Sequence, residues 1–240
     1  MPLKCQKHQK QIADMNQNKE IVNMPVQAVA ADKLIKATGE TLSVREIFYS
    51  LQGEGLRSGD PSIFIRLAFC NKDCWFCDTD WSYGTSMTVD AIIKEIAEFP
   101  CKWIVWTGGE PTLQLTDEIV EIFKKLGYKQ AIETNGTKVP PNGLDYITCS
   151  PKVEPPRLHR SFKNRHVGEF RYPVGMDGID PPNIIELPPA DYYYVSPLFL
   201  GEEKKRFVLD QGNLQQCIEF VKNTPGWRLS MQQHKIWDVR

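Results

Sequence analysis

The sequence has almost no excess of charge and no long apolar stretch. Its 29 lysine and arginine residues are balanced by 30 aspartate and glutamate residues, which gives a formal net charge of −1. A chain this close to neutral offers no electrostatic case for binding nucleic acid or an anionic membrane. No apolar run approaches the roughly 18 residues of a membrane-spanning helix, and the N-terminus lacks the continuous apolar core of a signal peptide. We therefore expect a cytoplasmic protein that binds neither nucleic acid nor membrane.

Cysteine is scarce and odd in number. Only seven cysteines occur among the 240 residues. An odd number cannot all pair in disulfides within the chain, and three of them are needed as thiolates, which fits a reducing compartment. Cys5, Cys101, Cys149 and Cys217 are predicted to be free thiols. The other three fall within a single short stretch, residues 70–77.

The composition is otherwise that of an ordinary globular protein. Hydrophobic residues make up 41% of the chain and charged residues 25%, and 240 residues suit one domain or a domain plus a small appendage. Residues 1–40 are rich in Gln, Lys and Asn with only short apolar patches, which predicts an N-terminal extension that is partly helical or disordered. Residues 41–240 form the predicted folded, catalytic domain.

Strands and helices are predicted to alternate over residues 41–240. Apolar patterns predict strands at 42–48, 62–69, 103–106, 130–133, 144–148, 168–174, 192–195 and 228–232. Helical spacing predicts helices at 89–99, 116–126 and 211–222, with Thr88 as the cap of the first and Asp210 at the start of the last. The basic, proline-containing stretch 151–165 is predicted to be a loop. The alternation predicts an α/β fold with a parallel sheet and fewer than eight β/α units.

Three closely spaced thiols provide the strongest chemical signal. Cys70, Cys74 and Cys77 have the spacing Cys-x3-Cys-x2-Cys, directly after a predicted strand. Four thiolates normally complete a zinc site or an iron–sulfur ligand set. Three thiols with no nearby fourth Cys or His therefore favour a [4Fe–4S] cluster with one iron open to a small molecule. The alternatives are a structural zinc loop with a distant fourth ligand, and three unrelated buried thiols.

Glycines and charges follow other predicted strands. In Gln52-Gly-Glu-Gly55 the glycines allow backbone to approach a ligand. In Thr107-Gly-Gly-Glu-Pro111 the glutamate could accept from an ammonium group, although such a string alone is also an ordinary turn. Arg66 lies inside an apolar strand, and a buried cation needs a partner. That partner could be a ligand carboxylate, or Glu46 or Glu54 in a structural ion pair.

Together these motifs resemble the radical S-adenosylmethionine (SAM) superfamily, and within it the 7-carboxy-7-deazaguanine synthase family. The resemblance runs from about residue 44 to the C-terminus. It implies an incomplete, open β/α barrel with few, short helices, and three cofactors: a [4Fe–4S] cluster, SAM and Mg²⁺. The segments that carry it are 51–55, Arg66, 70–79 and 107–111.

The resemblance also implies a reaction. Members of this family convert 6-carboxy-5,6,7,8-tetrahydropterin to 7-carboxy-7-deazaguanine with loss of ammonia, a step toward queuosine and related deazapurines. In the superfamily the open iron chelates SAM, and reductive cleavage gives a 5′-deoxyadenosyl radical that abstracts hydrogen. SAM is regenerated in this family, so it serves as a reusable cofactor. The implied partners are the pterin, an electron donor such as a flavodoxin or ferredoxin, and a second copy of the chain in a homodimer.

Site residues are assigned from the resemblance by matching motif positions. The cluster ligands are Cys70, Cys74 and Cys77, and Thr79 is the Mg²⁺ ligand. The implied SAM contacts are Phe76, Cys77, Asp78, Gly109, Glu110, Ser150, Pro151 and Lys152. The implied substrate contacts are Leu51, Gln52, Gly53, Glu54, Arg66, Thr107 and His234. No acid or base is assigned.

Two of these substrate contacts have specific roles, and the C-terminus departs from the family. Glu54 can pair with the guanidine-like edge of the pterin, and Arg66 with its carboxylate.

The family's Thr-His-Lys is Gln-His-Lys here, and residues 236–240 differ from the usual ending. The remaining histidines, His8, His159 and His166, are predicted to lie at the surface.

Two other functions share part of the pattern. A glycyl-radical-enzyme activase has the same cysteine spacing and a Gly-Gly-Glu motif, but it acts on a partner protein. Gln52, Glu54, Arg66 and Thr79 argue against that function. A non-catalytic iron–sulfur or zinc module is the alternative from another class, and it would need four protein ligands.

Overall fold

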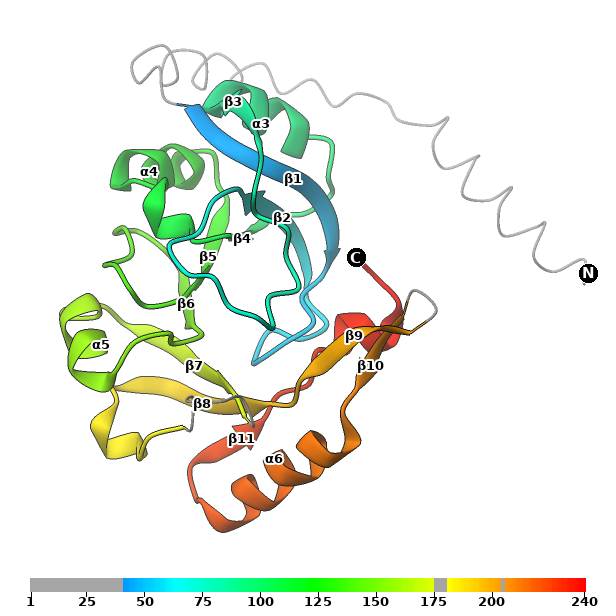
Figure 1. Ribbon diagram of the computed structural model, residues 1–240. Helices are drawn as coiled ribbons and strands as arrows, with labels where there is room; N and C mark the ends of the chain where they lie inside the picture. The colour runs from blue at the N-terminus through cyan, green and yellow to red at the C-terminus, as the bar shows by residue number, and fades with distance from the viewer. Residues whose placement is uncertain (1–40, 175–180, 204–205) are drawn as a thin grey trace, which may run out of the picture.

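The computed structural model describes residues 41–174, 181–203 and 206–240, and the predicted N-terminal extension and Cys5 lie outside this part of the chain. Its centre is a nine-stranded sheet in the order β11-β8-β7-β6-β5-β4-β2-β1-β3 (Figure 1). Neighbours from β2 to β11 run parallel, whereas β1 is antiparallel to both β2 and β3. The sheet curves without closing, as the predicted incomplete barrel requires. Its strands are β1 Thr41–Leu51, β2 Pro61–Leu67, β3 Thr85–Thr88, β4 Trp103–Gly108, β5 Lys129–Thr134, β6 Tyr146–Cys149, β7 Val167–Pro173, β8 Ala190–Ser196 and β11 Trp227–Leu229.

The helices are few and short, as predicted. They are α3 Val89–Ile96, α4 Asp117–Lys125, α5 Pro155–Ser161, α6 Gln211–Asn223 and α7 Gln233–Trp237, with single 3-10 turns at Pro111–Leu113 and Ile184–Glu186. Side chains cap three helix N-termini, because Thr88, Thr116 and Asp210 accept from the backbone N–H groups of Ala91, Ile119 and Asn213. None of the helices described is long and apolar enough to span a membrane.

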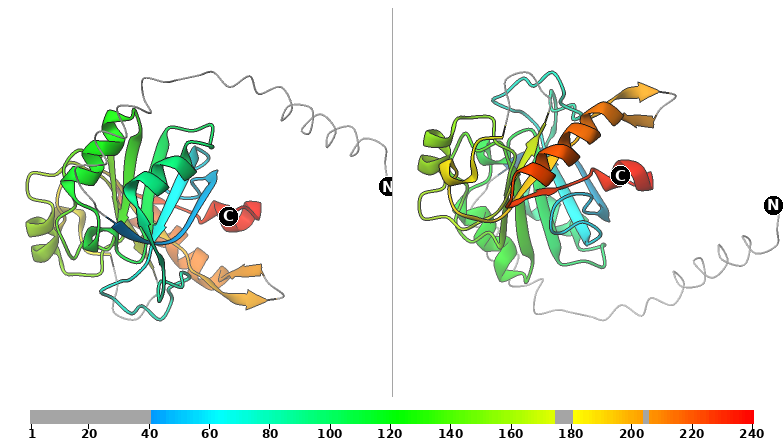
Figure 2. Two further views of the ribbon diagram at one scale, coloured as in Figure 1. Left: turned by 90° about the horizontal axis from the view of Figure 1, so that it is seen from above. Right: turned by 90° about the horizontal axis from the view of Figure 1, so that it is seen from below.

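The hydrophobic core lies between the outer face of the sheet and the helices that surround it (Figures 1 and 2). Ile63, Ile65 and Leu67 point outward at alternate positions of β2 and are fully buried. Further along the sheet, Trp106 of β4 packs edge-on against Phe123 of α4 at a centroid distance of 5.1 Å. The apolar side chains therefore stabilise the fold on the outer face and leave the inner face free for polar groups.

The inner face of the sheet carries a polar layer. In the strand register Glu46 lies beside Arg66 and Arg66 beside Thr107, while Glu133 lies beside Thr148 and Thr148 beside Glu169. Partners in register on adjacent strands point to the same side of a sheet. The concave face thus collects ionisable groups that must pair with one another or with a ligand.

The structure corrects two of the sequence predictions. Residues 151–165 were expected to form a loop, but they contain α5, whose proline-rich start suits the first helical turn and whose Leu158 is buried. The strand expected at 228–232 is shorter, because β11 ends at Leu229. The chain then enters α7, a helix that was not predicted. β3 and the hairpin of β9 (Phe199–Glu203) with β10 (Arg206–Leu209) were also missed. Cys101, Cys149 and Cys217 are free thiols, and His159 and His166 are exposed, as predicted.

Shortening Phe123 to alanine should destabilise the domain strongly. Phe123 is fully buried against Trp106 and Tyr128, and removing a buried phenylalanine costs about 3–5 kcal/mol of unfolding free energy. The matched control is Glu121→Ala on the exposed side of the same helix, where the ion pair with Lys125 is worth less than about 1 kcal/mol. Urea denaturation followed by circular dichroism measures both. Equal destabilisation by the two substitutions would contradict the packing described here.

Candidate active site

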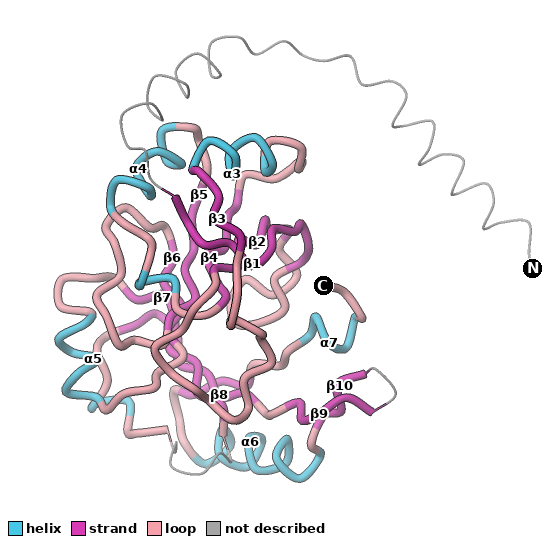
Figure 3. The backbone as a smooth tube through the Cα atoms, turned by 45° about the horizontal axis from the view of Figure 1, so that its top comes forward, coloured by secondary structure: helices cyan, strands magenta, loops and turns pink. Residues whose placement is uncertain are grey.

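Two adjoining cavities, of about 560 and 270 Å³, lie where the parallel strands end. The smaller is lined by the loop after β2 and by residues that end or follow β4, β5, β6, β7, β8 and β11. The long β2–β3 loop crosses the open end of the sheet (Figure 3). Glu54, Thr79, Thr107, Glu133 and Arg171 line both cavities and form part of their common wall.

The three motif cysteines all line the smaller cavity. The Asn135 amide donates to Cys70 Sγ at 3.9 Å, and the Cys77 N–H donates to the Cys74 carbonyl at 2.9 Å. Burial raises the pKa of the Cys70 and Cys74 thiols, and Lys152 partly offsets this for Cys74. No three Cys, His, Asp or Glu side chains in the described ranges converge tightly enough for one metal ion.

The glycines of the 107–111 motif bring the end of β4 against the cysteine loop. Gly108 has a φ of +112°, a backbone conformation that residues with a side chain rarely adopt. The Gly109 N–H donates to the Leu67 carbonyl at 2.9 Å, and a Cβ at Gly109 would overlap the carbonyl of Phe69. The glycines therefore let the end of β4 pack closely against the backbone of residues 67–70, and both glycines line the smaller cavity.

Glu110 and Pro151 are the two predicted SAM contacts that line neither cavity. The Glu110 carboxylate is fully buried and accepts from the Thr112 N–H and hydroxyl, the Thr134 hydroxyl and the Asn135 N–H at 2.6–3.0 Å. It joins the end of β4 to the end of β5, and so supports the cavity floor.

The other predicted SAM contacts share the smaller cavity: Phe76, Cys77, Asp78, Gly109, Ser150 and Lys152. Lys152 Nζ donates to the Ser150 hydroxyl at 2.8 Å. Ser196, which sequence reasoning missed, also lines this cavity, and its buried hydroxyl has no partner among the described residues. An unpartnered buried hydroxyl costs free energy unless a ligand supplies the hydrogen bond. The polar groups of Lys152, Ser150 and Ser196 therefore fit a polar ligand bound beside the three cysteines.

All the predicted substrate contacts line the larger cavity: Leu51, Gln52, Gly53, Glu54, Arg66, Thr107 and His234. Gln52 Nε2 donates to Glu133 Oε1 at 3.1 Å, and Gln52 Oε1 accepts from the Gly53 N–H at 2.8 Å. Gly53 leaves room for the His234 ring, which a Cβ would strike. The 52–55 loop and α7 thus pack directly against each other.

Arg66 has the structural partner that the sequence offered. Its Nε lies 3.0 Å from Glu46 Oε1, and its Nη1 donates to the Thr79 hydroxyl at 2.7 Å. Arg240 also forms an ion pair with Glu46. The C-terminal residues Ile236, Asp238, Val239 and Arg240 border the same cavity.

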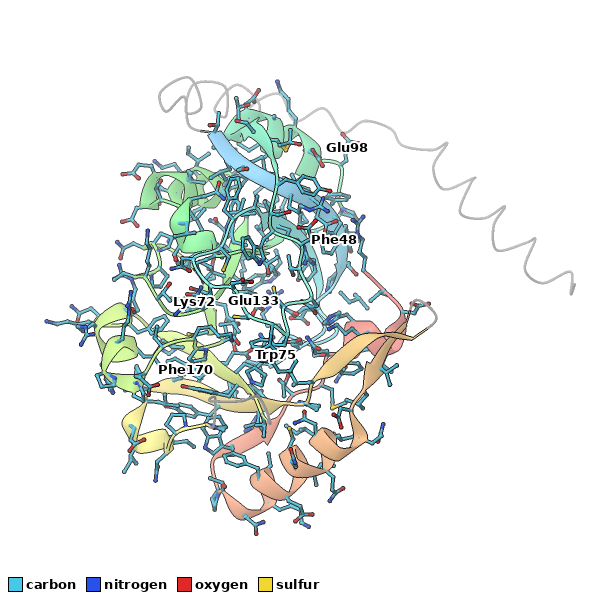
Figure 4. The ribbon with its side chains drawn as sticks, viewed as in Figure 1. Phe48, Lys72, Trp75, Glu98, Glu133 and Phe170 are labelled. Carbon is cyan, nitrogen blue, oxygen red and sulfur yellow. The ribbon has the colours of Figure 1, made fainter. Side chains whose placement is uncertain are left out.

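Sequence reasoning missed a charged cluster that forms part of the common wall. Arg171 of β7 is buried and pairs with Glu54, Glu133 and Glu169. Figure 4 shows Glu133 inside the curve of the sheet, with Lys72 and Trp75 on the loop in front of it. Burial, with nearby Glu169, raises the pKa of Glu133 to about 8. The available signal was a set of charges at alternate positions inside the predicted strands, Glu169 and Arg171 above all.

Comparison with known proteins identifies the family. The radical SAM superfamily matches residues 64–169. A 7-carboxy-7-deazaguanine synthase from Bacteroides thetaiotaomicron is 38% identical over 197 residues, which cover 82% of this chain and 98% of that protein. The chain belongs to the 7-carboxy-7-deazaguanine synthase family. A second 7-carboxy-7-deazaguanine synthase, from Haemophilus influenzae, is 38% identical over 81% of this chain and 92% of its own.

The fold agrees with this family assignment. The crystal structure of QueE from Escherichia coli matches with a TM-score of 0.62 at 22% identity, over 85% of this chain and 98% of that one. Membership of the 7-carboxy-7-deazaguanine synthase family rules against both the activase and the non-catalytic module.

His234 should remain neutral across neutral pH. Burial, followed by the Lys235 ammonium, lowers the pKa of its ring to about 4. Because the folded state resists protonation, His234 should reduce stability as pH falls from about 6.5 toward 4. NMR of histidine-labelled protein, with the resonance assigned by His234→Gln, measures the titration. A midpoint near 6.5 would show that the His234 ring is not packed against the 52–55 loop in solution.

Proposed function

We propose that this chain converts 6-carboxy-5,6,7,8-tetrahydropterin to 7-carboxy-7-deazaguanine with loss of ammonia. The observation that supports the proposal is that the predicted substrate contacts and the predicted cluster and SAM contacts line two different, adjoining cavities. The predicted substrate contacts line the larger cavity, and the cluster cysteines with most SAM contacts line the smaller. Because the two cavities share lining residues, a substrate in the larger and SAM in the smaller would lie next to each other, as direct hydrogen abstraction requires.

The smaller cavity is the proposed site of the cluster and SAM. Cys70, Cys74 and Cys77 would hold the cluster, and the Gly109 backbone, Lys152 and Ser196 would contact SAM. When bound, these two groups supply the hydrogen-atom abstraction and its reversal. The protein itself orients the two molecules and excludes water.

The larger cavity is the proposed pterin site. Glu54 and Gln52 present a carboxylate and an amide toward the guanidine-like edge of the ring, and Arg66 can accept a carboxylate on its fork. Glu133 lines both cavities, and its carboxylate accepts from Arg171 Nη2 and Gln52 Nε2 there. His234, kept neutral by burial, lines the same cavity near the 52–55 loop.

We further propose that Thr79 binds Mg²⁺ together with substrate oxygens and water. Its hydroxyl lies in the common wall, 2.7 Å from Arg66 Nη1 and 3.4 Å from an Asp78 oxygen. Mg²⁺ prefers oxygen ligands and often uses only one or two from the protein. The ion would neutralise the substrate carboxylate beside Arg66.

The electron donor, oligomeric state and compartment belong to the proposal as well. A flavodoxin or ferredoxin would reduce the cluster, and Trp75 between the ligand cysteines is 66% exposed, so the cysteine loop can be reached from solvent. The family resemblance supports a homodimer, and three thiolate ligands favour the cytoplasm.

Anaerobic turnover tests the proposed function. Protein reconstituted with iron and sulfide, then given SAM, dithionite, Mg²⁺ and 6-carboxytetrahydropterin, should form 7-carboxy-7-deazaguanine detectable by mass spectrometry. SAM should not be consumed stoichiometrically. Cleavage of SAM without a pterin product would sink the proposed substrate, and no cleavage by protein with a spectroscopically confirmed cluster would sink the radical reaction.

Removing the Thr79 hydroxyl should weaken Mg²⁺ binding. In Thr79→Ala the Mg²⁺ concentration for half-maximal activity should rise roughly 10- to 100-fold, because one of few protein ligands is lost. Thr79→Ser keeps the hydroxyl and is the matched control. The readout is activity against Mg²⁺ concentration at saturating pterin. An unchanged Mg²⁺ requirement in Thr79→Ala would rule the hydroxyl out as a ligand.

A further inference from the structure

A single guanidinium, that of Arg171, lies in the common wall of the two cavities. Arg171 lies on β7 with its side chain 8% exposed. Its Nη1 pairs with Glu54, its Nη2 donates to both oxygens of Glu133 at 3.1 Å, and its Nη2 and Nε donate to Glu169 Oε1 at 2.9 and 3.2 Å. These three carboxylates come from the 52–55 loop, β5 and β7 itself.

The three carboxylates have different surroundings. Glu54 and Glu133 line both cavities, with side chains 13% and 23% exposed. Glu169 lines neither, is 2% exposed, and its other oxygen accepts from the Leu56 N–H and the Tyr146 hydroxyl, each at 3.0 Å. Glu169 therefore holds Arg171 on the side away from the cavities, whereas Glu54 and Glu133 face the cavities.

We propose that Arg171, held by Glu169, is a positioning residue that fixes Glu54 and Glu133 for recognition of the pterin ring. The inference rests on the proposed function and adds residues to it that no sequence motif indicated. Glu54 uses Oε2 for Arg171, which leaves Oε1 available for N–H groups of a guanidine-like edge. Arg171 thus fixes the orientation of the Glu54 carboxylate, which in turn binds that edge of the pterin.

Arginine is required here because of its shape. A guanidinium has five N–H donors in one plane and can serve three carboxylates at once, whereas an ammonium is a point charge. The side chain also comes from a strand of the rigid sheet, while Glu54 belongs to a loop. Without Arg171 the loop carboxylate loses its ion pair, and the partly exposed Glu133 and the buried Glu169 both lose their cation.

The loop itself is attached at this cluster. Besides the Leu56 contact with Glu169, the Gly55 N–H donates to the Ser230 hydroxyl at 2.9 Å, and the Gln233 N–H donates to the Gly53 carbonyl at 2.9 Å. Gly55 has a φ of +65°, and a Cβ there would overlap the Glu169 carboxylate. The Glu169–Arg171 pair therefore fixes both the backbone and the side chain of the 52–55 loop.

Two substitutions at Arg171 test the proposal. Arg171→Gln should raise the KM for the pterin roughly 100-fold, the effect of removing one partner from a buried charge pair. Arg171→Lys, which keeps the charge but not the fork, should raise it roughly tenfold and so restore part of the loss. The affinity for SAM, measured by calorimetry on reconstituted protein without pterin, should stay within about threefold, since the smaller cavity keeps its other contacts.

Arg57→Gln is the matched control. Arg57 is a second buried arginine, 8% exposed, that stacks on Trp103 at 3.8 Å and lines neither cavity. Its loss should lower thermal stability and leave the pterin KM within about threefold. A general loss of packing would raise KM in both arginine variants, so a rise in Arg171→Gln alone separates positioning from stability.

Each outcome decides a different point. If the wild-type protein forms no product from the pterin, the proposed function fails and the role of Arg171 in it falls with it. If the wild-type protein turns over and Arg171→Gln keeps its KM, the positioning role is wrong. If Arg171→Gln does not fold, Arg171→Lys decides alone, and an unchanged KM in that variant overturns the inference. Equilibrium binding of the pterin without dithionite gives a second readout that needs no catalysis.

Discussion

The site depends on the pairing of one buried cation with three carboxylates. A guanidinium taken out of water costs several kcal/mol, and the cost is recovered only where good hydrogen bonds surround it. Arg171 meets that condition with partners from the 52–55 loop, β5 and β7. The same contacts fix the wall between the two cavities, so the stability of the inner face and the geometry of the site have a common origin.

The polar inner face is possible because the apolar side chains are used elsewhere. β2, β4 and β5 place isoleucine, tryptophan and leucine outward against α3 and α4, where they are fully buried. The barrel does not close, so the inner face can stay open to ligands, with Glu133 and Arg66 only partly covered. Parallel strands end together at one side of the sheet, and the loops that follow them therefore converge on one site.

The sequence was most informative where function is local in the chain. The cysteine loop, the Gly-Gly segment and the 52–55 loop could each be recognised from a few consecutive residues, and all three contribute residues to the lining of the two cavities. Arg171 was missed because its partners Glu54 and Glu133 are far from it in sequence, and only the strand register brings them together. The helix α5 was missed because prolines and basic residues suggested a loop, whereas prolines at a first turn and a buried Leu158 stabilise a helix.

Arg66 shows why a structural ion pair and a ligand contact need not exclude each other. The pair with Glu46 joins side chains that are 25% and 23% exposed, and a partly exposed pair of this kind contributes about 1 kcal/mol or less. A substrate carboxylate can replace it at little cost, particularly because Arg240 remains available to Glu46. If Arg66 binds the substrate carboxylate as we propose, Glu46 would orient the guanidinium beforehand, and Arg240 would remain paired with Glu46 afterwards. Arg66, Arg240 and Glu46 together carry a net charge of +1, which a substrate carboxylate would neutralise, whereas Arg171 is already paired with three carboxylates.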